Sequence, residues 1–301
     1  MSDPPEEVRR LAEERAAKRA ARDFGAADEL RDRILDLGWI VRDAAGGFDL
    51  EPAGEPEAPL RVRVEDVASV LDEAPTHDVS VHWLPERWPD DVVRGIESFR
   101  RHQGVRTVQH VVVETTEAAA GTWPDDVEVV RLERHPGFGS ARNAGLRRSR
   151  GRVVVIADGS IEADGDVLGP LEAALADPTI GVAGPFGIVT RDLQAFEESD
   201  GPEVDAIEAY LMALRRELLD EVRFHRAFRF YRSADIDLSF QVKALGLRAV
   251  RVEVPVTKHE HRRWTTTPPE LRWRWSKKNF YRFLDRFRGR DDLLATRPDL
   301  R

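Results

Sequence analysis

Apolar and polar positions along residues 78–254 follow two alternating patterns. Short apolar runs rich in β-branched residues predict buried strands at 79–84, 108–113, 127–132, 153–157, 181–183 and 249–254. Between them, apolar side chains that recur every three or four residues predict helices at 90–102, 140–148, 166–176, 210–222 and 235–245. This succession predicts an α/β fold, with a mostly parallel sheet flanked by helices.

The first part of the chain has the pattern of a separate, smaller unit. An apolar residue at every fourth position from Val8 to Phe24 predicts one helix, and Ala26 to Leu37 a second, with Leu30, Ile34 and Leu37 facing inward. Apolar segments at 39–41 and 48–50 flank Ala44-Ala45-Gly46-Gly47 and predict a hairpin. We therefore expect a small helical hairpin followed by a β-hairpin.

Proline and acidic residues dominate the stretch that follows, with four prolines between residues 51 and 77. Such composition is typical of a linker. The expected organisation is a helical appendage at 1–52, a linker at 53–77, the main domain at 78–262 and a C-terminal basic aromatic helix at 263–301.

The C-terminal helix has one seam, formed by Trp273, Lys277, Phe280, Leu284 and Phe287, that is aromatic or apolar except at Lys277 and is bordered by basic side chains. Two interpretations remain open. The seam packs against the helix's own domain while the arginines face water, or residues 270–290 lie on an anionic membrane surface.

Composition narrows the classes of function. The 301 residues carry a net charge of −9, which argues against nucleic acid as a partner of the whole protein. Zero cysteines exclude disulfides, zinc–thiolate sites and cysteine nucleophiles. The N-terminus has no apolar signal segment, and no apolar run reaches membrane-spanning length. We expect a cytoplasmic location, with peripheral membrane attachment as the variant.

One carboxylate lies at the carboxyl end of a predicted strand, where α/β proteins bind their ligands. The apolar run 153–157 ends at Asp158, and ligands of open α/β sheets bind beyond the carboxyl ends of the strands. Asp158 could hold a hard cation such as Mg²⁺, whereas Ser160, two residues later, is a weaker neutral ligand. An aspartate at this point can equally cap the following helix.

Residues 6–50 resemble the C-terminal region of cysteinyl-tRNA synthetases, in Leu11-Ala12-Glu13-Glu14-Arg15, Asp23-Phe24, Leu30-Arg31-Asp32 and Leu37-Gly38-Trp39. In that family the region helps to engage tRNA. Acidic and basic residues are nearly balanced here, and a phosphate-binding surface should be basic. We therefore expect a structural adaptor, with contact to RNA as the minor alternative.

Residues 78–262 resemble family 2 glycosyltransferases, enzymes of the A-type fold that use nucleotide sugars. The motifs that carry the likeness occur in the family's order: Val111-Val112-Val113-Glu114, Gly137-Phe138-Gly139-Ser140-Ala141-Arg142-Asn143-Ala144-Gly145, Arg215-Arg216-Glu217-Leu218-Leu219 and Ala234-Asp235-Ile236-Asp237-Leu238.

The resemblance implies a donor site. Asp158 and Ser160 take the place of the family's Asp-x-Asp motif, and Glu114 that of an aspartate that contacts the nucleoside. Arg142 and Asn143 would face the base or phosphates, although a solvated helix face explains both as well. The implied partner is a nucleotide sugar, and the implied cofactor is Mg²⁺ or Mn²⁺.

The resemblance also implies catalytic and further metal-binding residues. Asp235 falls on the family's catalytic base, with Asp237 two residues later, although Ala234 replaces the usual glutamate. His259 and His261 fall near a histidine that reaches the metal or pyrophosphate. Asp235 and Asp237 can instead cap a helix, and the histidines can be an ordinary surface pair.

Three functions remain open from the sequence. The first is an inverting glycosyltransferase of the hexosyltransferase type, acting on an unidentified acceptor that in many related transferases is lipid-linked. The second is a glycosyltransferase-like binding or scaffolding protein, favoured by Ser160, Ala234 and Glu114. The third, an RNA-associated role through residues 6–50, has the least support.

Overall fold

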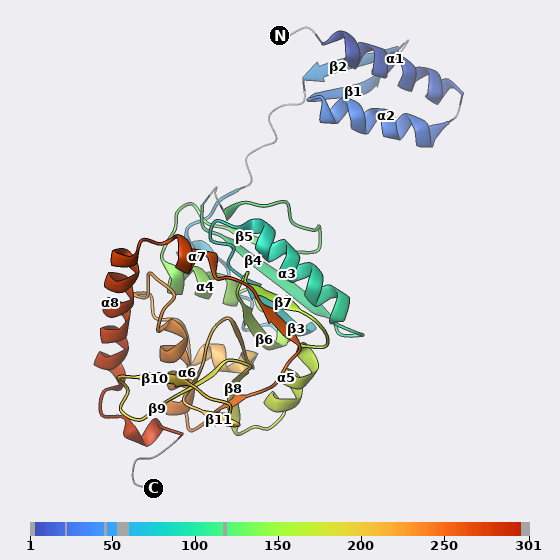
Figure 1. Cartoon of the computed structure of the whole chain (residues 1–301). Helices are drawn as coiled ribbons and strands as arrows, with labels where there is room; N and C mark the ends of the chain where they lie inside the picture. Colours follow the sequence, from blue (N-terminus) through green and yellow to red (C-terminus); the bar gives the residue numbers. More distant parts are fainter. Residues whose placement is uncertain (1–3, 22, 45–46, 53–59, 117–118, 296–301) are drawn as a thin grey trace. The chain divides into compact units, whose positions relative to one another are not determined.

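The computed structural model describes residues 4–21, 23–44, 47–52, 60–116 and 119–295. The chain forms two compact units, residues 1–60 and residues 61–301, whose own folds are visible in Figure 1.

The first unit is a helical hairpin followed by a β-hairpin, as predicted. Helices α1 (Glu6–Ala20) and α2 (Phe24–Asp36) precede the antiparallel strands β1 (Trp39–Ala44) and β2 (Gly47–Pro52). The core contains Val8, Leu11, Ala12, Leu30, Ile34, Trp39 and Val41.

The inward face of this unit differs from the expected one. Leu11 and Arg15 are buried, whereas Ala20 is exposed. An apolar residue at every fourth position drifts by about 40° per step around a helix of 3.6 residues per turn, so the expected stripe leaves the buried face. Leu37 is 43% exposed because α2 ends before it, at Asp36.

The second unit is built on an eight-stranded sheet with the strand order β11-β14-β8-β13-β6-β3-β4-β5. Strands β5, β4, β3 and β6 are mutually parallel, and β14 is parallel to β8. The strands are β3 (His77–Trp83), β4 (Val108–Glu114), β5 (Glu128–Arg131), β6 (Gly151–Ala157), β8 (Ile180–Gly184), β11 (Glu203–Val204), β13 (Leu211–Arg215) and β14 (Arg248–Arg251).

The helix predicted at 210–222 is wrong. Residues 211–215 form β13, which lies antiparallel between β6 and β8, and only Arg216–Asp220 form a short 3₁₀ turn. Leucine, methionine, alanine and arginine favour a helix locally. Burial between two neighbouring strands overrides that preference, because a central strand leaves no unpaired backbone group on either side.

Helices cover both faces of the sheet. On one face, α3 (Pro89–His102) and α5 (Leu168–Leu175) pack on residues such as Val81, Trp83 and Val155. On the other, α4 (Phe138–Leu146) and α6 (Ala234–Ala244) pack on Val111, Val154 and Ile156. Because both faces are buried, β6 is apolar from Val153 to Ala157, whereas β3 and β4 also bury the polar side chains of Ser80, His82, Gln109 and His110.

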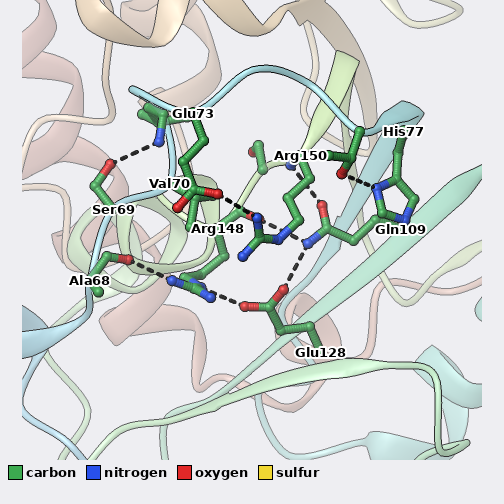
Figure 2. A network of polar contacts seen from close by, with 12 residues as sticks. Ala68, Ser69, Val70, Glu73, His77, Gln109, Glu128, Arg148 and Arg150 are labelled. Atoms are coloured by element: carbon green, nitrogen blue, oxygen red, sulfur yellow. Dashed lines mark hydrogen bonds and ion pairs between the residues drawn. The ribbon is translucent and has the colours of Figure 1, made fainter.

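Residues 61–77, which the sequence assigned to a linker, belong to the second unit. The segment contains the 3₁₀ turn Val64–Asp66, and Val62 forms a bridge with Leu132. Figure 2 shows the polar network beside it, in which Arg148 donates to the Ala68 carbonyl and Arg150 pairs with Glu73.

The same network joins the amino-terminal ends of β4, β5 and β6, which carry Gln109, Glu128 and, just before β6, Arg150. These ends lie opposite the carboxyl ends at which the site described below is found. The Gln109 amide donates to the Glu128 carboxylate at 2.8 Å and to the Arg148 carbonyl at 2.9 Å, and its oxygen accepts the Arg150 N–H (Figure 2). Gln109 is itself 7% exposed, so a buried amide has its donors and acceptor satisfied.

The C-terminal segment comprises α7 (Arg262–Thr266), α8 (Pro269–Phe287) and a 3₁₀ turn at Asp291–Leu293. Phe283, Leu284 and Phe287 are buried against Phe240 of α6, while Trp273 is 66% exposed. The helix thus packs on its own domain through its C-terminal half, and its N-terminal half presents aromatic and basic side chains outward. Within the described residues, no helix combines the length and apolarity needed to span a bilayer.

Two small sheets complete the unit. Strand β9 (Gly187–Thr190) pairs with β10 (Phe196–Glu198) and β12 (Ala206–Ile207). Strand β7 (Ile161–Ala163) pairs with β15 (Val256–Lys258) and so brings together two segments about a hundred residues apart in the sequence.

Candidate active site

A pocket of about 270 Å³ opens beyond the carboxyl end of β6. Its wall includes Arg142, Asp158, Asp235 and His261, which come from four separate elements of the chain. A second hollow shares Arg142, Asp158 and His261 and extends along the chain after β3, past Glu86 and Trp88. The sequence-predicted residues on these walls therefore lie around one continuous site.

Asp158 is the centre of the site's hydrogen bonds. One carboxylate oxygen accepts the Ser160 N–H at 2.9 Å and the Ser160 hydroxyl at 2.6 Å, and the other lies 3.4 Å from His261 Nε2. Burial acts to raise the pKa of Asp158, but His261 and Ser160 outweigh it and lower the pKa to about 2. Asp158 is therefore a carboxylate at any physiological pH, and Ser160 orients it.

The β7–β15 ladder places one of the two predicted histidines at Asp158. The backbone N–H of His259 donates to the Ser160 carbonyl, and the chain then turns. His261 caps α7, because its Nδ1 accepts the backbone N–H of Trp264 at 3.1 Å. The ring of His261 also packs on Tyr231, with centroids 4.4 Å apart. Its Nε2 is thus directed at Asp158 by contacts on two other sides.

His259 lies apart from this centre. Its Nε2 is 2.9 Å from a carboxylate oxygen of Glu162, and neither residue lines the pocket walls described above. Two histidines two positions apart would face one way on a continuous strand, but β15 ends at Lys258 and α7 begins at Arg262. The intervening turn separates the two rings.

Arg142 forms the floor of the site. The side chain is 3% exposed, and it donates to the carbonyl oxygens of His82 and Ala157, at the carboxyl ends of β3 and β6. Its Nε has no hydrogen-bond partner within the described residues. Burial lowers the pKa of Arg142 to about 10, against the charges of Asp158 and Glu86, so the guanidinium stays cationic at neutral pH.

Glycines allow α4 to carry Arg142 this deeply. Gly137 has φ of 96°, a backbone conformation that favours glycine, and a Cβ on Gly139 would come within 2.5 Å of the His225 carbonyl oxygen. The first N–H groups of α4 donate to the Phe228 and Arg229 carbonyls. The apolar, glycine-rich start of α4 therefore serves close packing.

Two of the predicted donor-site residues are engaged elsewhere. The Asn143 amide exchanges hydrogen bonds with the backbone of Phe224, at 2.7 and 3.0 Å. Glu114 is 1% exposed and accepts from Trp123 Nε1 at 2.6 Å, with Arg131 3.1 Å from its other oxygen. Neither residue lines the pocket walls described above.

Asp235 and Asp237 point to different places. Asp235 lines the pocket and accepts the Ala209 N–H at 3.2 Å, and burial raises the pKa of its carboxyl group. Asp237 is fully buried behind it, paired with Arg286 of α8 and hydrogen-bonded to Gln241. Two residues along a helix turn the side chain by about 200°, so Asp237 joins α6 to α8.

Ser233 provides the local geometry that presents Asp235. It is the N-cap of α6 and adopts the left-handed conformation with φ of 65°. A non-glycine residue in this conformation stores strain that the surrounding structure must offset. The strained residue and Asp235 both line the pocket.

Glu208 is a site residue that the sequence analysis missed. It lies between β12 and β13 and lines the same pocket as Asp235. Burial, reinforced by the charge of Asp235, raises the pKa of Glu208 to about 7, while Lys258 and Arg232 oppose the rise. A lone glutamate after Asp205-Ala206-Ile207 has no motif around it, so only the fold could reveal it.

A divalent cation fits the pair Asp158 and His261 better than it fits the full predicted set of Asp158, His259 and His261. Their oxygen and nitrogen atoms are 3.4 Å apart and face one space, and both are ligands that Mn²⁺ accepts. Among the described residues, no group of three or more such ligands comes together. A metal here would need its remaining ligands from a bound substrate and water.

Comparison with protein families identifies both parts of the chain. Residues 112–237 match the family described as glycosyl transferase family 2, and residues 1–48 match the cysteinyl-tRNA ligase anticodon binding domain. The second unit therefore contains a segment that matches the glycosyltransferase family 2 model, and both resemblances drawn from the sequence are confirmed.

Individual relatives cover short stretches. The cysteine–tRNA ligase of Opitutus terrae is 46% identical over 52 residues, which are 17% of this chain and 11% of the ligase. The succinoglycan biosynthesis protein ExoO of Rhizobium meliloti is 41% identical over 75 residues, 23% of this chain and 21% of ExoO. The chain thus spans about a tenth to a fifth of the curated relatives that it matches.

The fold is that of the A-type glycosyltransferases. The solved structure of GalNAc-T7 with UDP, GalNAc and Mn²⁺ superimposes with a TM-score of 0.57, at 18% identity, over 69% of this chain and 48% of that one. The α/β fold with its central sheet, predicted from the hydrophobic pattern, is confirmed.

Proposed function

We propose that the second unit is an inverting glycosyltransferase that moves a hexose from a nucleoside diphosphate to an acceptor hydroxyl. The observation that carries the proposal is that Asp158, at the end of β6, and Asp235, in α6, line one pocket with Arg142 on its floor. The family 2 match over 112–237, and UDP with Mn²⁺ in the structurally similar GalNAc-T7, support it.

The donor would lie against Asp158 and His261. A divalent cation held by these two side chains would neutralise the negative charge that develops on the leaving diphosphate. Ser160 holds one oxygen of Asp158 and leaves the other free to face His261. The buried charge of Arg142 adds a positive potential from below.

Asp235 would act as the general base. The acceptor oxygen attacks the anomeric carbon, the bond from that carbon to the phosphate oxygen breaks, and the diphosphate leaves with the bonding electrons. The acceptor proton passes to the Asp235 carboxylate. Burial raises the pKa of Asp235, which makes it a stronger base than an exposed aspartate. A single base on the acceptor side gives inversion.

Calorimetric titration with UDP-glucose, UDP-GalNAc and GDP-mannose, with and without MnCl₂, tests the donor site. We expect metal-dependent binding that Asp158→Asn weakens at least tenfold. Asp164→Asn is the matched control, because Asp164 is an exposed carboxylate six residues away that accepts from Thr257. Absence of binding to all three nucleotide sugars in the unaltered protein would refute the enzyme proposal.

Turnover separates the enzyme from a binding protein with the same fold. Release of UDP or GDP from the bound donor, lost in Asp235→Asn, would support catalysis. Tight binding with no release, together with the Ser160 and Ala234 departures from the family pattern, would favour the recognition role instead.

The first unit carries a second candidate function, contact with tRNA. The observation that favours it is the match of residues 1–48 to an anticodon-binding domain. A gel-shift assay with total tRNA tests this directly. A shift that disappears when residues 1–60 are deleted would support the role, and the same shift in the deleted protein would contradict it.

A further inference from the structure

A shallow groove beside the active-site pocket carries three basic side chains, Arg232, Arg272 and Lys277. The groove is walled by Trp264 and by the outward half of α8, where Trp273 is 66% exposed. It has no aspartate or glutamate on its wall. Positive charge and aromatic surface therefore coincide at one place.

Two of the cations share one aromatic ring. The guanidinium carbon of Arg272 lies 4.6 Å from the centre of the Trp264 ring, and that of Arg232 lies 5.5 Å from it. Lys277 similarly lies 4.5 Å above the Trp273 ring. Aromatic faces attract cations, but they do not neutralise two like charges brought to the same ring.

Among the described residues, the three cations also lack a close ion-pair partner, although Arg232 acts at longer range on Glu208 and Asp235 of the adjoining pocket. In the described part of the chain none of them forms an ion pair with a carboxylate, although the protein has a net charge of −9. Their neighbours are paired: Arg263 with Glu86, and Arg286 with Asp237. An unpaired cluster amid such an excess of carboxylates is a site at which an anion would be stabilised.

The groove is continuous with the catalytic pocket. Arg232 and Ser233 line both, and Ser233 is the strained residue that presents Asp235. The charge of Arg232 is felt at Asp235, where it lowers the pKa against the effect of burial. A ligand in the groove would therefore place its neighbouring atoms at the proposed base.

From these contacts we propose that the groove binds an anionic, phosphate-type group carried by the acceptor sugar, next to the hydroxyl that reacts. This inference rests on the proposed glycosyltransferase function and names the substrate class of its acceptor side. Arg272 and Lys277 hold the anion, the exposed Trp273 contacts the sugar, and Arg232 links the groove to Asp235.

Calorimetry with α-D-glucose 1-phosphate as probe, and methyl α-D-glucopyranoside as its neutral counterpart, tests the proposal on the full chain. We expect the phosphate ester to bind and the neutral glycoside to bind at least tenfold more weakly. The double variant Arg272→Gln/Lys277→Gln should lose at least tenfold in affinity for the phosphate ester. Equal affinity for both probes, or no binding of either, would overturn the inference.

The same helix offers a matched control. Arg274 and Lys278 are exposed residues of α8 outside the groove, and Arg274→Gln/Lys278→Gln removes the same charge. It should leave the affinity for glucose 1-phosphate unchanged. Equal loss in both double variants would show a general charge effect and overturn the proposal, and circular dichroism melting confirms that both remain folded.

Two further arms distinguish other outcomes. Sedimentation with phosphatidylglycerol vesicles that depends on both pairs of residues equally would assign the face to a membrane surface and overturn the acceptor proposal. A protein that binds nucleotide sugars but not glucose 1-phosphate refutes this inference alone. One that binds no nucleotide sugar refutes the proposed function, whatever the groove binds.

Discussion

Replacing Glu208 by glutamine should make the protein more stable at alkaline pH. The carboxyl group lies in the pocket beside Asp235, and burial raises its pKa from 4.5 to about 7. Between these two pH values the folded state keeps a proton that the unfolded chain has lost. Stability contributed by this group is therefore present below pH 4.5 and is lost as the pH rises through 7.

The size of the effect follows from the same values. One pKa unit corresponds to about 1.4 kcal/mol, so the difference between 4.5 and about 7 corresponds to roughly 3 kcal/mol. This is an upper limit because the pocket admits water to part of the side chain. Glutamine cannot ionise, so the variant avoids the cost, and the relief of Asp235 from a neighbouring charge acts in the same direction.

Urea unfolding followed by tryptophan fluorescence measures the effect between pH 4 and pH 8.5. Six of the seven tryptophans belong to residues 61–301, so the signal reports chiefly on the unit that contains Glu208. The free energy of unfolding of the variant minus that of the unaltered protein should rise by up to roughly 3 kcal/mol across this range.

A control separates this effect from the loss of one negative charge. Glu221→Gln removes a carboxylate at an exposed position away from the pocket, and its difference from the unaltered protein should not grow by more than a few tenths of a kcal/mol. If the Glu208→Gln difference is equally flat with pH, Glu208 is not held in its protonated form and the reasoning fails.

The remaining predictions concern packing and buried charge, and urea unfolding measures each of them. Phe283→Ala removes a fully buried ring and should cost about 3–5 kcal/mol; a cost below 1 kcal/mol would mean that α8 is not docked as described. Arg286→Gln leaves the buried Asp237 unpaired and should cost about 3–5 kcal/mol at pH 8. That cost should shrink at pH 5, because burial already raises the pKa of Asp237 to about 6, and a pH-independent cost would contradict it. Arg142→Met leaves two strand-end carbonyl oxygens without their donors and should cost about 2–4 kcal/mol; an unchanged midpoint would show that water replaces the guanidinium.

The strands were the most predictable part of the fold. Runs such as Val153–Ala157 are apolar on both faces, and their short length and β-branched residues favour a buried strand over a helix. Strand β13 was missed because Leu211–Arg215 is equally compatible with a helix, and only the gap between β6 and β8 decided the matter.

The site was partly predictable for a similar reason. Asp158 follows directly from its place at a strand end. Asp235 was indicated by the order of motifs, yet its distinction from Asp237 depends on the direction in which α6 lies between the pocket and α8. The partner of Asp158 could not be read from spacing, since the β7–β15 register is what selects His261 over His259.

The sequence by itself determined the alternation of strands and helices, the separate helical hairpin at the N-terminus and the resemblance of the central segment to glycosyltransferase family 2. These depend on hydrophobic period and local motifs, which are properties of neighbouring residues. Only the tertiary structure decided which charges meet: Glu208 with Asp235 in one pocket, and Arg232 with Arg272 on one tryptophan ring. Electrostatic interactions depend on distance in space and on burial, and for residues tens of positions apart both are set by the packing of the whole domain.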